Sequence, residues 1–251
     1  MSAPDDRTTA AAPAGVRGSS RGTLLAASLG AGAAIGYVLP GLAGLLPALR
    51  GPLGVEDRTA GGHGYALTFD DGPHPRGTPA MLEILAREGV RATFFLVGEQ
   101  VLRSPALAGE IAAAGHQIAL HCHRHRNLLR LSPRQVREDV ARAYEAIVAH
   151  AGAEIELYRP PYGVLNASAL RLARARGWRT LLWSHWGRDW QAKATPESIA
   201  ALVTAGAGEG SVLLLHDADD YSAAGSWRRT AAALPRVLDE LAGRGLQPVF
   251  P

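Results

Sequence analysis

Cysteine and lysine are nearly absent from this sequence. Its 251 residues include one cysteine, Cys122, which excludes an intrachain disulfide and a cysteine-rich metal cluster. Lys193 is the only lysine, and the net charge of +3 is not gathered into a basic run, so the composition does not favour nucleic acid as a partner. Apolar residues make up 47% of the chain and charged residues 20%, which is typical of a globular protein.

Charge is also missing from one long stretch, Gly22–Leu49. About 20 apolar residues suffice to span a bilayer, and Arg17 and Arg21 precede the stretch as a positive flank. Its glycines and prolines disfavour the alternative, a buried helix or loop of a soluble protein. We therefore expect a transmembrane or signal segment. As a transmembrane segment, it would make the protein a single-pass membrane protein with an external domain. As a signal segment cut near Gly41-Leu42-Ala43, it would make the protein a secreted one.

The rest of the chain divides into a tail, a linker and a domain. Residues 1–21 are polar and predict a disordered N-terminal tail. Residues 50–63 have the composition of a linker, so one folded domain is expected over residues 64–251.

From residue 64 onward, short apolar runs alternate with amphipathic segments. This alternation predicts βα units and a parallel sheet, and its length suits a small or incomplete β/α barrel. The expected strands are Tyr65–Phe69, Ala92–Val97, Gln117–Leu120, Thr180–Trp183, Ser211–Leu215 and Gln247–Phe250. The expected helices are Thr78–Glu88, Ser132–His150, Asn166–Arg176, Thr195–Ala205 and Trp227–Gly243.

Polar residues follow four of the expected strands. They are Asp70-Asp71-Gly72-Pro73, the run from His121 to His125, Asp189-Trp190 and His216-Asp217. In β/α barrels the reactive groups gather at the carboxyl ends of the strands. We therefore expect these four runs to share one site.

The adjacent carboxylates Asp70 and Asp71 allow two interpretations. Asp-Gly-Pro is common turn chemistry, so the pair could form a solvated turn and nothing more. In the functional interpretation the two side chains diverge at the end of a strand, so that one binds a metal while the other handles a proton.

The histidines after Gln117–Leu120 have the spacing of metal ligands. His121 and His125 are four residues apart, as in other His-x3-His zinc pairs. In an extended conformation His121, His123 and His125 would share a face, which makes His123 a rival ligand. The thiolate of Cys122 is a further possible ligand, although a lone cysteine is more often a small buried residue.

Five short motifs occur in a fixed order. They are Thr68-Phe69-Asp70-Asp71-Gly72-Pro73, His121-x3-His125, Arg159-Pro160-Pro161-Tyr162-Gly163, Asp189-Trp190 and Leu213-Leu214-Leu215-His216. Together they resemble the motifs of the polysaccharide deacetylases, the NodB-homology enzymes of carbohydrate esterase family 4. The resemblance covers roughly residues 64–250. It implies a distorted, incomplete (β/α) barrel of about seven strands with one divalent metal, usually zinc.

The resemblance also implies a role for each matched position. The expected metal ligands are Asp71, His121 and His125. The expected catalytic residues are the general base Asp70, its partner Arg159, the general acid His216, its partner Asp189, and Tyr162, whose backbone N–H helps to hold the oxyanion. The expected substrate-binding residues are Tyr162, Trp190 and Leu214.

Two positions depart from the family pattern. Where the second motif has a Ser or Thr hydroxyl that braces the metal-site loop, this sequence has Cys122, and a thiol is a poorer hydrogen-bond partner. Where the fourth motif has an aspartate three residues before Asp189, it has Trp186. With Trp183 and Trp190, this indole either packs the rim of the barrel or forms a wall on which sugar rings stack.

The resemblance implies a metal-dependent hydrolase that removes N-acetyl groups from a glycan such as peptidoglycan or chitin. The same residues allow an O-acetyl esterase of xylan-type sugars or an amidase of small molecules, since the attack does not depend on which acyl carbonyl is presented. A catalytically silent carbohydrate-binding module is the alternative outside the enzymes, and Asp70 and His216 argue against it. The expected partners are an acetylated polysaccharide and a membrane, and no pattern indicates a protein partner.

Overall fold

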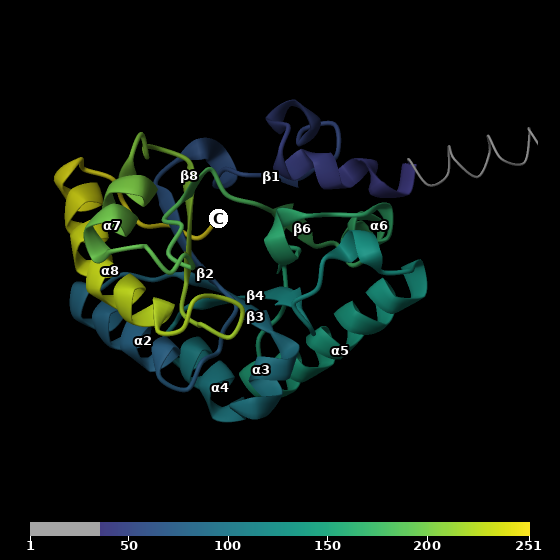
Figure 1. Ribbon diagram of the computed structural model, residues 1–251, viewed down its shortest axis with the longest axis horizontal. Helices are drawn as coiled ribbons and strands as arrows, with labels where there is room; N and C mark the ends of the chain where they lie inside the picture. Colours follow the sequence, from purple (N-terminus) through teal and green to yellow (C-terminus); the bar gives the residue numbers. More distant parts are fainter. Residues whose placement is uncertain (1–35) are drawn as a thin grey trace, which may run out of the picture. The chain divides into compact units, whose positions relative to one another are not determined.

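The centre of the protein is a curled sheet of eight parallel strands. The computed structural model describes residues 36–251, and Figure 1 shows how the sheet lies within them. The strand order is β1-β6-β5-β4-β3-β2-β8-β7, and in this part of the chain the edge strands β1 and β7 do not pair. The predicted incomplete barrel is therefore confirmed, with one strand more than the seven or so expected. The strands are β1 Val55–Glu56, β2 Tyr65–Asp70, β3 Thr93–Val97, β4 Gln117–Cys122, β5 Leu157–Tyr158, β6 Arg179–Leu181, β7 His185–Trp186 and β8 Ser211–His216.

The main helices lie outside the strands (Figure 1). Because side chains alternate between the two faces of a strand, the sheet separates two apolar clusters. In β2, Leu67 and Phe69 join the large core between sheet and helices, whereas Ala66 joins a small core inside the curl. The helices are α2 Gly77–Glu88, α3 Gly98–Arg103, α4 Pro105–Ala113, α5 Pro133–Ala151, α6 Ala167–Ala175, α7 Pro196–Thr204 and α8 Ser226–Gly243.

Sequence signals explain where most of the predicted helices begin. α5 follows Ser132 and α7 follows Thr195, and each of these side chains closes a capping box with the residue three positions later. α2 differs, because it begins at Gly77 and Thr78 is not its cap. The Thr78 hydroxyl instead accepts a hydrogen bond from the His74 N–H, which ties the helix to the loop after β2.

Some elements differ from the sequence prediction. The pattern does not predict α3, α4, β1, β5 or β7. The three strands have two residues each and α3 has six, which is too short to show a clear period, while α4 consists mostly of alanine and other small or apolar residues and shows no distinct polar face. The expected strand Gln247–Phe250 is reduced to a single bridge between Tyr65 and Pro248. Proline has no N–H to donate to a ladder, which limits pairing there.

Residues 36–63 belong to the folded unit. The Tyr37 hydroxyl donates to the Leu131 carbonyl oxygen at 2.7 Å and accepts from Asn166 Nδ2 at 2.9 Å. Two 3-10 turns follow, η1 Leu39–Gly44 and η2 Pro47–Leu49. The segment interpreted as a linker supplies β1, which pairs with β6. The folded unit therefore begins well before the expected boundary at residue 64.

The expected tail, residues 1–21, and half of the expected transmembrane or signal segment, residues 22–35, lie outside the described residues. The other half of that segment, residues 36–49, belongs to the folded unit and contains the turns η1 and η2. Within residues 36–251 no helix combines the length and the apolar character needed to cross a membrane.

Candidate active site

The inner face of the sheet changes from apolar to polar toward the carboxyl ends of the strands. The small inner core contains Ala66 of β2 and Val212 of β8. Because side chains alternate, the residues two and four positions later face the same way. On these two paired strands that rule brings Asp70 opposite His216. The same rule, applied to the neighbouring inner-core residues, brings His121, Arg159 and Trp183 to the inner face.

Asp70 is held by a buried guanidinium. Arg159 Nη1 donates to Asp70 Oδ1 at 2.7 Å and to the Thr68 hydroxyl at 2.8 Å, while Nε and Nη2 donate to the carbonyl oxygens of residues 181–182. Arg159 has no exposed surface, and its guanidinium carbon lies 3.8 Å from the centre of the Phe95 ring. These contacts fix the side chain of Arg159 in one conformation. The ion pair with Arg159 in turn orients the Asp70 carboxylate.

The backbone of Asp71, the first residue after β2, departs from the extended conformation of the strand. Its φ of 79° lies in the left-handed region, which is unfavourable for a residue with a side chain and recurs at functional sites. Asp71 Oδ1 lies 3.6 Å from His121 Nε2 and 3.4 Å from His125 Nε2. His121 Nδ1 donates to the Arg159 carbonyl oxygen at 2.7 Å. In the neutral imidazole, Nε2 therefore keeps a lone pair for a cation.

The three side chains fit a divalent metal. One ligand atom of each lies within 4.8 Å of the others. Among the described residues, Asp71 Oδ1 is buried without a hydrogen-bond partner, which is unfavourable for a carboxylate unless a cation or a proton satisfies it. Two imidazoles and one carboxylate also leave an open position on the metal, as in catalytic rather than structural zinc sites.

Burial keeps the two imidazoles of this set neutral. Desolvation lowers the pKa of His121 to about 3 and the pKa of His125 to about 3. Desolvation also raises the pKa of Asp71 to about 7, against the opposing charge of His216. Neutral imidazole is the form that binds a metal, and a bound cation favours the ionised carboxylate.

His216 is in the opposite electrostatic state. Its Nδ1 lies 2.8 Å from Asp189 Oδ1, and Asp189 Oδ2 accepts from the His216 N–H at 2.7 Å and from the Thr230 hydroxyl at 2.8 Å. Burial alone would lower the pKa of His216, but the negative charges of Asp189, Asp71 and Asp70 raise it to about 10. His216 is therefore charged at neutral pH, with Nε2 3.9 Å from Asp71 Oδ2.

These groups line an open cavity of about 210 Å³. One wall is aromatic, with the ring centres of Trp183 and Trp186 6.0 Å apart and those of Trp186 and Trp190 5.4 Å apart. Leu214 completes the inner lining, whereas Leu213 and Leu215 face the large core. The lining residues are Asp70, Asp71, His121, His125, Tyr162, Trp183, Trp186, Trp190, Leu214, His216, Tyr221 and Ser222.

Most of the expected site residues line this cavity, and the other two, Arg159 and Asp189, support Asp70 and His216 from behind. The rival ligand His123 lines a different pocket, together with residues of α5. Cys122 is buried. It does not line the cavity, and its sulfur is not among the ligand atoms grouped with Asp71, His121 and His125.

Sequence reasoning missed Tyr221. Its ring stacks on His125 with centres 4.6 Å apart, and its hydroxyl donates to Glu99 Oε1 at 2.6 Å. Tyr221 comes from the irregular loop between β8 and α8, where no periodic pattern exists. The one signal in the sequence is that this loop follows the strand that ends in His216.

Comparison with known proteins adds independent findings. Residues 57–181 match the family described as Polysaccharide deacetylase. Over 185 residues the chain is 35% identical to a peptidoglycan-N-acetylglucosamine deacetylase of Bacillus cereus, covering 72% of this chain and 82% of the relative. It is 36% identical over 185 residues to a chitooligosaccharide deacetylase of Sinorhizobium fredii, covering 71% and 86%. Its structure is similar to the family 4 carbohydrate esterase from Streptomyces lividans in complex with acetate, with a TM-score of 0.67 and 32% identity over 74% of this chain and 91% of that one.

Proposed function

The chain belongs to the polysaccharide deacetylase family, and we propose that it removes N-acetyl groups from an N-acetylated glycan with the help of a divalent metal, zinc or another. One observation carries this proposal. One open cavity is bordered by a buried Asp-His-His ligand set, by a carboxylate that an arginine holds, and by an imidazolium that a second carboxylate holds.

The first half of the reaction uses Asp70. Asp71, His121 and His125 would hold a divalent metal, and the chemistry such a metal would supply is that of a Lewis acid that acidifies water and polarises a carbonyl. Asp70 lies beside this ligand set, so its carboxylate accepts the proton of the water that attacks the acetamide carbon. Arg159 holds Asp70 in the orientation for that transfer.

The second half of the reaction uses His216. An amine leaves poorly unless it receives a proton, and His216 has one to donate because Asp189 favours its charged form. The backbone N–H of Tyr162, next to the cavity, is the proposed donor to the negative carbonyl oxygen. The products are acetate and a sugar with a free amine.

The proposed substrate is a polymer that contains N-acetylglucosamine. The names of the Bacillus and Sinorhizobium relatives support this class of substrate, and the indole wall offers flat apolar faces to sugar rings. Asp70 and His216, the two residues proposed to transfer protons, are both present and correctly supported, which argues against a silent carbohydrate-binding module.

Acetate release by the full chain tests the proposal. Peptidoglycan, N-acetylglucosamine oligomers and acetylxylan are offered in parallel, with and without a chelator. We expect acetate from one or both of the first two, loss of activity with the chelator, and recovery on adding Zn²⁺. Acetate from acetylxylan alone would identify an O-acetyl esterase, and metal binding without any acetate release would indicate the silent module.

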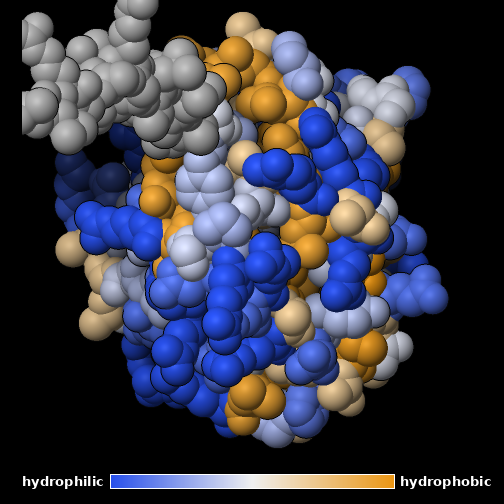
Figure 2. Space-filling view, turned by 90° about the vertical axis from the view of Figure 1, so that its right-hand side faces the viewer, coloured by the Kyte–Doolittle hydropathy of each residue, from blue (hydrophilic) through white to orange (hydrophobic). Residues whose placement is uncertain are grey.

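We also propose that the domain works at the outer surface of a membrane. The sequence preceding η1 is uncharged back to Gly22, and η1 and the turn after it expose apolar side chains, among them Leu45 with 78% of its surface accessible. Figure 2 shows one face of the molecule, on which hydrophobic side chains gather toward the top and continue in smaller groups between hydrophilic ones below. The full chain should stay with membranes after a high-salt wash. A carboxyl-terminal reporter that is active in the cytoplasm would contradict the orientation.

A further inference from the structure

The metal-site loop begins where regular structure ends. His121 lies in β4, but residues 123–127 have no helix or strand conformation. His125, the third proposed ligand, therefore stands on irregular backbone. Cys122, at the position where the family motif has a bracing hydroxyl, offers a thiol, which is a poorer hydrogen-bond partner. Something else has to hold this loop if His125 is to stay near His121 and Asp71.

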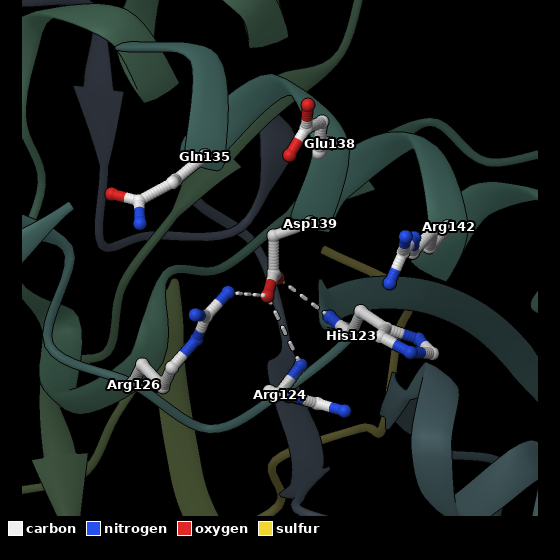
Figure 3. A pocket seen from close by; sticks show the side chains of 7 residues that line it. All are labelled: His123, Arg124, Arg126, Gln135, Glu138, Asp139 and Arg142. Carbon is white, nitrogen blue, oxygen red and sulfur yellow. Dashed lines mark hydrogen bonds and ion pairs between the residues drawn. The ribbon is translucent and has the colours of Figure 1, made fainter. Parts of the chain in front are cut away.

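Asp139 of α5 contacts the loop at three points. Its Oδ2 accepts from the His123 N–H at 2.8 Å, and its Oδ1 accepts from the Arg124 N–H at 3.3 Å and from Arg126 Nη2 at 2.6 Å. Figure 3 shows the carboxylate at the centre of these three donors. All three belong to residues that lie between the ligands or next to His125. Asp139 is only 4% exposed, so these hydrogen bonds compensate its desolvation.

The helix that carries Asp139 is itself well fixed. α5 is closed at its start by the Ser132–Gln135 capping box, and its last residue is followed by Gly152 in the left-handed conformation. Val136 and Val140, which flank Asp139 on the helix, are buried in the large core. Movement of the Asp139 carboxylate would therefore disturb core packing as well as its own hydrogen bonds.

We propose that Asp139 is a positioning residue of the metal site, which holds the backbone between His121 and His125 in the binding conformation. It touches neither the cavity nor the proposed ligand atoms, so it acts through the loop. This inference rests on the proposed metal site. Groups that hold metal ligands in place commonly contribute tenfold to a hundredfold to metal affinity.

Asp139→Asn is the informative variant. An amide keeps the size of the side chain, but its NH₂ group cannot accept a hydrogen bond from a backbone N–H. Glu138→Gln is the matched control, because Glu138 is the next residue on α5 and pairs with exposed Arg134 instead of the loop. Zn²⁺ affinity of the full chain is measured by calorimetric titration well below the melting temperature of each variant.

We expect the affinity to fall about tenfold to a hundredfold in Asp139→Asn and to stay unchanged in Glu138→Gln. A purely structural role would lower the melting temperature of Asp139→Asn and leave the affinity of the folded protein unchanged, which would overturn the proposal. If the unchanged protein bound no metal, the proposed function itself would be wrong, so the two failures are distinguishable.

Amide hydrogen exchange of the unchanged, metal-free protein tests the same inference if Asp139→Asn does not fold. The N–H groups of His123 and Arg124 should exchange on the order of a hundredfold more slowly than in an unstructured peptide, because the buried carboxylate holds them without help from a metal. Exchange at the unstructured rate would show that Asp139 does not hold the loop, and would overturn the proposal.

Discussion

The two sides of the cavity hold histidines in opposite protonation states. Desolvation takes the pKa of His121 and His125 down to about 3, whereas the pKa of His216 rises to about 10. All three side chains are largely buried. The difference lies in the partner of each ring, since His121 Nδ1 faces a backbone carbonyl oxygen and His216 Nδ1 faces the Asp189 carboxylate. Neighbours rather than burial thus decide which imidazole can bind a metal and which can donate a proton.

Asp71→Asn should have the largest effect, because it removes one of the three proposed metal ligands. The change removes the one anionic group among the three proposed ligands. Metal affinity and acetate release should both fall steeply, and excess metal should restore part of the rate. Metal content after dialysis and the dependence of rate on metal concentration measure this. Full metal content after dialysis would remove Asp71 from the ligand set.

Asp70→Asn should reduce the rate and spare the metal. The amide cannot accept the proton of the attacking water, so acetate release should drop by about a hundredfold to ten-thousandfold, the usual size of a general-base effect. The metal should remain near one equivalent, and added metal should not help. The two variants make the same chemical change at adjacent residues. The reverse outcome, with metal lost from Asp70→Asn and kept by Asp71→Asn, would exchange the roles of ligand and base.

Much of this site could be predicted from the sequence, for a physical reason. Asp70, His121 and His216 end apolar runs, and the carboxyl ends of parallel strands meet at one edge of a sheet. Strand alternation then decides which side chains face inward, so that Leu214 lines the cavity and its neighbours do not.

The supporting residues could not be predicted in this way. Asp139, Thr230 and Tyr221 reach the site from two helices and a long loop, through contacts with residues 13 to 122 positions away. Such contacts depend on how helices pack on the sheet, and a single sequence carries no periodic signal for them. The early start of the folded unit was missed for a similar reason, because β1 is two residues long and its partner β6 is more than a hundred residues away.

Asp189→Asn tests whether the Asp189 carboxylate keeps His216 charged, in contrast to the neutral His121 and His125. The general acid must be protonated, so activity falls as the pH rises through the pKa of His216. Asp189, Asp71 and Asp70 are the charges that face His216, and replacing the nearest one by a neutral amide lowers that pKa. The alkaline limb of the pH–rate profile should move to lower pH while metal content stays unchanged. An unmoved limb would mean that Asp189 does not control the protonation of His216.

Trp186→Ala separates two interpretations of the indole wall. Trp186 is 38% exposed at the cavity rim, so a sugar ring stacked there would lose about 1 kcal/mol of contact, which corresponds to about a fivefold higher KM with little change in kcat. Leu202→Ala, at an exposed position on α7, is the control. An unchanged KM with a lower melting temperature would favour rim packing over substrate contact.

Cys122→Ser should have the smallest effect on the site, although Cys122 is the neighbour of a proposed ligand. Burial raises the pKa of its thiol well above the ordinary value, so the sulfur remains protonated, and only a thiolate is a strong metal ligand. Its sulfur also lies outside the group of ligand atoms that Asp71, His121 and His125 bring within 4.8 Å of one another. Metal affinity and rate should therefore stay within about twofold, while a buried hydroxyl lowers the free energy of unfolding by about 1 kcal/mol. Loss of metal from a folded Cys122→Ser protein would add Cys122 to the ligands and show that the Asp-His-His set is incomplete.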